Sequence, residues 1–78
     1  MPRFFFHLYD DMVSLDPEGK ELPTSAEARE EAISAARHLA CAEVLDGHLG
    51  LNHRIEVTDA ADAPVATVLF RDVVRLHP

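Results

Sequence analysis

The side chains of this sequence that could carry out chemistry are its five histidines, its acidic residues and its single cysteine. Zinc sites use closely spaced pairs of histidines or cysteine thiolates on rigid elements. Here the histidines are separated by 31, 10, 5 and 24 residues, and one cysteine cannot form a thiolate pair. The pattern therefore predicts no metal site. It predicts a packed strand residue at His7 and surface residues at the other four positions, which are His38, His48, His53 and His77.

One local arrangement could support catalysis or hold a cation, because Asp10 and Asp11 follow His7 closely. Adjacent aspartates at the end of a strand are more typical of a solvated turn. Cys41 lacks the nearby base and orienting group that a nucleophile needs, and the three glycines are too scattered to form a phosphate-binding loop. We therefore expect no catalytic residue, no cofactor and no metal ligand, and a site built from His7, Asp10 and Asp11 is kept as an alternative.

Size and charge limit the remaining classes of function. Seventy-eight residues form a single domain, residues 1–78, and fourteen acidic side chains against seven basic ones give a net charge of −7. An acidic chain lacks the positive surface that nucleic acid or an anionic membrane requires, so we expect neither as a partner. No apolar run approaches the roughly 20 residues that span a membrane. The short apolar start and the single cysteine favour a cytoplasmic protein.

The elements that must position these side chains can be predicted from local patterns. Residues 3–9 alternate as a strand, residues 12–15 favour a short return strand, and 16–19 (Asp-Pro-Glu-Gly) are typical of a turn. Thr24 and Glu27 have the spacing of a capping box, and Gly47 is placed to end a helix of about 22 residues. Residues 54–58 and 65–70 then alternate as an antiparallel hairpin.

The predicted fold class is α+β, with one long amphipathic helix packed on a small, mostly antiparallel sheet of three to four strands in the order β-β-α-β-β. The buried face of the helix is mostly alanine, which lets a helix lie close to a sheet. Its predicted members are Ala28, Ala32, Ile33, Ala36, Leu39, Ala40 and Val44. The order of the strands in the sheet is left open, because a crossover next to either late strand is allowed.

The first strand is apolar or aromatic on both faces. If the helix covers Phe4, Phe6 and Leu8, then the opposite face presents Phe5, His7 and Tyr9. One helix cannot cover both faces of a sheet, and a chain of this size buries barely enough apolar surface to offset the entropy lost on folding. We therefore expect a homodimer whose interface includes Phe5, His7 and Tyr9.

Four blocks of sequence resemble a family of small bacterial proteins of unknown function, which is abundant in alphaproteobacteria and whose members begin Pro-Arg-aromatic-aromatic-Phe-His. The blocks are Met1–His7, Glu18–Pro23, Ile55–Asp59 and Phe70–Val74, and they extend over nearly the whole chain. The family carries no established activity, so the resemblance implies no functional residue.

Three functions therefore remain in view. The first is a non-enzymatic cytoplasmic module that self-associates. The second is an acidic regulator of a basic protein partner, because the strand pair, the acidic turn and the helix starting near Thr24 are similar at the level of fold to small antitoxins that mask a toxin ribonuclease. The third is a metal-binding or catalytic site at the end of the first strand.

Overall fold

Strand β1 (Arg3–Tyr9) lies inside the sheet in the computed structural model, which describes residues 1–78. It pairs antiparallel with β4 (Arg54–Asp59), and β4 pairs antiparallel with the edge strand β5 (Pro64–Leu69). Its other side carries two short strands, β2 (Val13–Ser14) and β3 (Lys20–Glu21). The order β2-β1-β4-β5, with β3 also on β1, confirms the α+β class and decides the strand order.

Helix α1 (Ser25–Leu45) begins and ends at the signals read from the sequence. The Thr24 side chain accepts a hydrogen bond from the Glu27 amide at 3.2 Å, which satisfies one of the free N–H groups of the first turn. At the other end Gly47 adopts a φ of 89°, the left-handed conformation that ends helices, and the His48 amide bonds back to the Glu43 carbonyl. The capping and stop residues therefore determine the helix length.

Alanines form the contact between α1 and the sheet. The four at successive turns are at most 2% exposed: Ala28, Ala32, Ala36 and Ala40. They pack with Phe4, Ile55, Val57 and Val68 from the facing side of the sheet. The predicted face was too wide, because Leu39, one residue before the buried Ala40, and Val44, one turn after it, are both exposed.

Asp16 fills a gap between β2 and β3. These two strands pair with opposite ends of β1, so the Phe6 amide between them has no strand partner. One Asp16 carboxylate oxygen accepts from that amide at 3.2 Å, and the other accepts from the Glu18 and Gly19 amides at 3.1 Å each. The predicted turn at 16–19 is therefore present, and it also completes the hydrogen bonding of β1.

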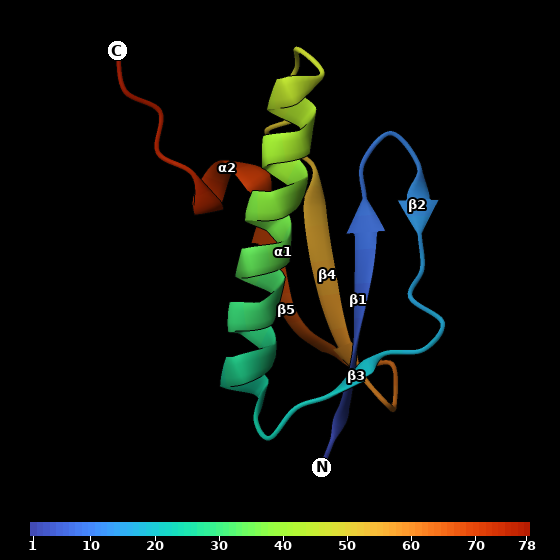
Figure 1. The fold of residues 1–78 in the computed structure, drawn as a ribbon. Helices are drawn as coiled ribbons and strands as arrows, with labels where there is room; N and C mark the ends of the chain where they lie inside the picture. Colours follow the sequence, from blue (N-terminus) through green and yellow to red (C-terminus); the bar gives the residue numbers. More distant parts are fainter.

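The last strand ends one residue earlier than the pattern predicted. Phe70 begins a short helix, α2 (Phe70–Val73), and its side chain is fully buried beneath α1. The Phe70 amide still donates to the His53 carbonyl at 2.8 Å, so the hydrogen bonding between β5 and β4 continues for one more bond before the chain turns. Figure 1 shows α1 running along one side of the sheet with α2 beside it, and neither helix covers the opposite face. No helix has the length and apolar composition needed to cross a membrane.

Candidate functional site

His7 does not join Asp10 and Asp11. Its ring lies on the sheet face opposite α1, where Nδ1 accepts from the Asp16 amide at 3.0 Å and Nε2 lies 3.0 Å from the Thr58 hydroxyl. Because Nδ1 accepts, the ring carries its proton on Nε2 and donates it to Thr58. Both nitrogens are therefore used in holding the turn and the sheet together, and the alternative site built from His7, Asp10 and Asp11 does not form.

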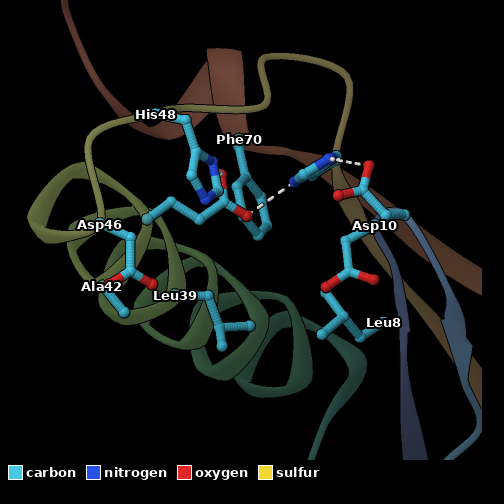
Figure 2. Close-up of a pocket in the computed structure, with 10 residues that line it drawn as sticks. Leu8, Asp10, Leu39, Ala42, Asp46, His48 and Phe70 are labelled. Carbon is cyan, nitrogen blue, oxygen red and sulfur yellow. Dashed lines mark hydrogen bonds and ion pairs between the residues drawn. The ribbon is translucent and has the colours of Figure 1, made fainter.

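The two aspartates instead contribute to a pocket of about 310 Å³ at the carboxyl end of α1. Figure 2 shows the side chains of α1 on one side of this pocket and those of the end of β1 on the other. Its apolar lining consists of Leu8, Leu39, Ala42 and Phe70. Its polar lining consists of Asp10, Asp11, Glu43, Asp46, His48 and His53, so carboxylates and imidazoles meet there without a lysine or arginine.

A close pair, Glu43 and His53, organises the polar side of the pocket. Glu43 Oε2 lies 2.7 Å from His53 Nδ1, and Glu43 Oε1 accepts from the Gly50 amide at 2.8 Å. The side chains of His53 and Glu43 are only 17% and 14% exposed. Gly50 leaves room for the ring, because a Cβ at that position would overlap His53. The last turn of α1 thus holds the loop that leads into β4.

The electrostatics of this pair follow from its contacts. The hydrogen bond that His53 donates to Glu43 raises the pKa of His53 and outweighs the opposing effect of burial, and Asp11 and Asp10 add to the increase. Burial alone would raise the pKa of Glu43, but the Gly50 amide and the His53 ring outweigh it and lower that pKa. Both shifts favour the charged pair, a carboxylate beside an imidazolium.

The pair has part of the arrangement used for proton transfer. A carboxylate holds Nδ1 of the His53 ring, while Nε2 points toward Asp11, whose Oδ1 lies 3.6 Å away. No hydroxyl or thiol lines the pocket to act as a nucleophile, and Cys41 is exposed outside it. No group of three or more histidine, cysteine or acidic side chains is arranged to hold a metal ion. The Glu43–His53 pair can hold a proton, but the pocket supplies neither a nucleophile nor a set of metal ligands.

The prediction that His53 is a surface residue was wrong. Its partner Glu43 lies ten residues earlier, and the two meet only because the helix stop at Gly47 reverses the chain. The local signal was a glutamate in the last turn of a helix followed by a loop containing glycine and histidine. That signal is too common to identify a pair without the path of the loop.

The predicted face of Phe5, His7 and Tyr9 does form, with all three side chains half-buried on the side away from α1. In register beside them on β4 lie Thr58, Glu56 and Arg54. The Arg54 guanidinium lies 4.4 Å from the centre of the Tyr9 ring and pairs with Glu56 at 2.6 Å. This sheet face is therefore a mixture of aromatic and paired polar side chains, less apolar than the first strand alone indicated.

Comparison with known proteins gives one match. A family model described as a domain of unknown function, DUF6894, matches residues 3–71, which include every strand, the whole of α1 and the first two residues of α2. No curated protein and no solved structure matches the chain.

Proposed function

We propose that this chain, which belongs to the DUF6894 family of domains of unknown function, is a non-enzymatic cytoplasmic binding module that assembles as a homodimer. The dimer forms through the sheet face opposite α1. One observation supports the proposal most directly. Both helices pack on the other side of the sheet, so the aromatic side chains of this face remain in contact with solvent.

The apolar part of this sheet face extends beyond the three residues of β1. The Phe5 ring lies parallel to the His7 ring, with their centres 6.5 Å apart. Strand register places Val13 of β2 beside Tyr9, and Val13 is 59% exposed. On the other side Leu69 of β5 is in register with Arg54. Burying these apolar side chains against a second molecule lowers the free energy in proportion to the apolar area that is removed from water.

Charge favours a second copy of the same chain as the occupant. Although the protein carries a net charge of −7, both strand arginines of this face are paired with glutamates. Arg3 lies 3.7 Å from Glu21, and Arg54 lies 2.6 Å from Glu56. Two copies that approach through these paired positions meet less repulsion than copies that approach through the rest of their acidic surface.

One end of the same face is acidic, and it supports a particular pairing. Asp59 and Asp62 line a shallow pocket of about 260 Å³ next to Phe5, at the end of the sheet away from Arg54. In a two-fold arrangement with antiparallel strands, the acidic end of one copy meets the Arg54 end of the other. This is the pairing that we expect.

Light scattering on the purified chain tests the proposal with two matched substitutions. Val13→Lys places a charge in the face, whereas Val44→Lys places the same charge on α1, where the residue is 58% exposed. We expect a dimer for the wild type and Val44→Lys at tens of micromolar, and a monomer for Val13→Lys with an unchanged circular dichroism spectrum. A monomeric wild type would refute the proposal.

A regulator of a basic protein partner is the second candidate. It is supported by the four carboxylates around the pocket, which no lysine or arginine of this chain approaches. A partner that uses this rim should be recovered from cell extract by the wild type and lost with Asp10→Asn and Asp11→Asn together. Equal recovery by both would contradict this candidate.

A further inference from the structure

The His53 ring connects two parts of the chain that are otherwise separate on either side of the pocket. Through Nδ1 it bonds to Glu43 of α1 at 2.7 Å, and through Nε2 it approaches Asp11 of the turn between β1 and β2 at 3.6 Å. The ring also meets Phe70 edge to face, with centres 5.7 Å apart, so its plane is set by packing. Dashed lines in Figure 2 mark the contacts of the ring with the two carboxylates.

The two contacts respond differently to loss of a proton. A carboxylate only accepts hydrogen bonds, so the nitrogen beside Glu43 keeps its hydrogen whether the ring is charged or neutral. The proton that leaves at higher pH is therefore the one on Nε2, which faces Asp11. A neutral ring would present a lone pair to the Asp11 carboxylate, and that contact would become repulsive.

Other charged groups also lie near the His53 ring. Four carboxylates line the same pocket as the ring: Glu43 of α1 and Asp46, which follows α1, on one side, and Asp10 and Asp11 of the turn on the other. His48 Nδ1 lies 3.9 Å from Glu43 Oε1, the oxygen that does not contact His53 Nδ1. Arg71 of α2 bonds to the Leu51 carbonyl and the Asn52 side chain, and Arg54 of β4 lies on the opposite sheet face with Tyr9.

The turn between β1 and β2 makes few contacts with the rest of the protein. Asp11 is 93% exposed, and His53 is the one side chain with which it pairs. The turn keeps its shape through two bonds between Asp10 and Met12, and the β2 strand that follows is only two residues long. Few contacts therefore oppose a movement of the turn away from α1.

We propose that His53 is a pH-operated latch across the mouth of this pocket. Protonated, it ties the β1–β2 turn to the end of α1 and narrows the pocket; neutral, it stays bonded to Glu43 and releases the turn. The pKa of His53 is raised above the ordinary 6.5, so the latch is closed below that value and opens as the pH rises through the folded-state pKa. The proposal is independent of the sheet-face dimer.

An NMR titration of the full chain from about pH 5 to 8.5 tests the latch. We expect the His53 imidazole and the backbone amides of Asp11 and Met12 to titrate with one common midpoint above that of a free histidine. His48→Gln, which removes the neighbouring imidazole, should leave that midpoint in place. Turn amides that do not follow His53, or a ring that does not titrate in this range, would overturn the proposal.

Two matched substitutions separate the latch from a general effect of charge. Asp11→Asn should move the His53 midpoint to lower pH, because it removes a nearby carboxylate, and should abolish the response of the turn amides. Glu30→Gln removes the same charge from an exposed position of α1 and should change neither. Equal effects of the two variants would also overturn the proposal.

Discussion

Replacing Asp16 by alanine tests whether one carboxylate holds the amino-terminal third of the chain to the sheet. The side chain accepts from three backbone amides, two of them in partly buried positions at Phe6 and Gly19 and one exposed at Glu18. The Asp16 amide in turn donates to His7 at 3.0 Å. Without the carboxylate, the Phe6 amide has no partner within the protein, because neither β2 nor β3 reaches that part of β1.

The size of the effect follows from these contacts. A partly buried amide that loses its acceptor costs about 1 kcal/mol, and an exposed one costs about half as much because water replaces the acceptor. Asp16→Ala should therefore lower the free energy of unfolding by about 2–3 kcal/mol. For a domain of this size that corresponds to a decrease in Tm of about 10–20 °C.

Urea and thermal unfolding followed by circular dichroism at pH 7 measure this loss. Asp72→Ala is the matched control, because Asp72 is exposed and its side chain accepts no hydrogen bond in the structure; it should change the free energy of unfolding by less than about 0.5 kcal/mol. If Asp16→Ala is no more destabilising than Asp72→Ala, the carboxylate does not complete the hydrogen bonding of β1 and the reasoning is wrong.

The pH dependence provides a second test of the same contacts. Burial alone would raise the pKa of Asp16, but the Gly19, Phe6 and Glu18 amides, together with His7, lower it below the ordinary value of 3.8. A lowered pKa means that the contribution is full above 3.8 and is lost as the pH falls through the folded-state value. The advantage of wild type over Asp16→Ala should therefore shrink at low pH. An advantage that is constant with pH would contradict the charge-dependent part of the argument.

Three further substitutions test separate parts of the fold. Gly50→Ala should displace the His53 ring and cost about 1–3 kcal/mol of stability, and the pKa of His53 should fall toward its ordinary value as the Glu43 contact is lost, which NMR titration measures. Ala36→Leu should cost about 1–3 kcal/mol in urea unfolding because α1 lies against the sheet there with no free space, whereas Ala26→Leu on the exposed first turn should be nearly neutral. Thr24→Ala should cost about 0.5–2 kcal/mol by removing the cap of α1, and Ser25→Ala, which removes no capping bond, should cost less; equal losses would show that the cap contributes nothing.

Local signals in the sequence predicted the long elements well because each is stabilised by contacts within a few residues. The caps at Thr24 and Gly47 bound α1, and alternation along residues 54–58 placed Ile55 and Val57 in the core. The two-residue strand β3 was not predicted, because two residues carry no periodicity. The early end of β5 was also missed, since Val68 and Phe70 keep the alternation of a strand while the backbone already turns.

The candidate site was much less predictable. Sequence analysis placed Phe5, His7 and Tyr9 on one face, because alternation along one strand is a local property. It did not show that Arg54 and Glu56 would balance the charge of that face, since this depends on which strand pairs with β1. The contact of Asp11 with His53 joins residues 42 positions apart, and no pattern in either segment indicates the other.

The amino-acid sequence by itself determined the α+β class, the length of α1 and the two-sided character of β1, because caps, turns and alternation act over distances of a few residues. The tertiary structure alone decided which charges meet. Packing of α1 on its alanines brings the carboxyl end of the helix beside the end of β1, and this proximity converts His53 and the acidic residues of two distant segments into one pocket. Electrostatic interactions depend on distance in space, so they are fixed only when the fold has formed.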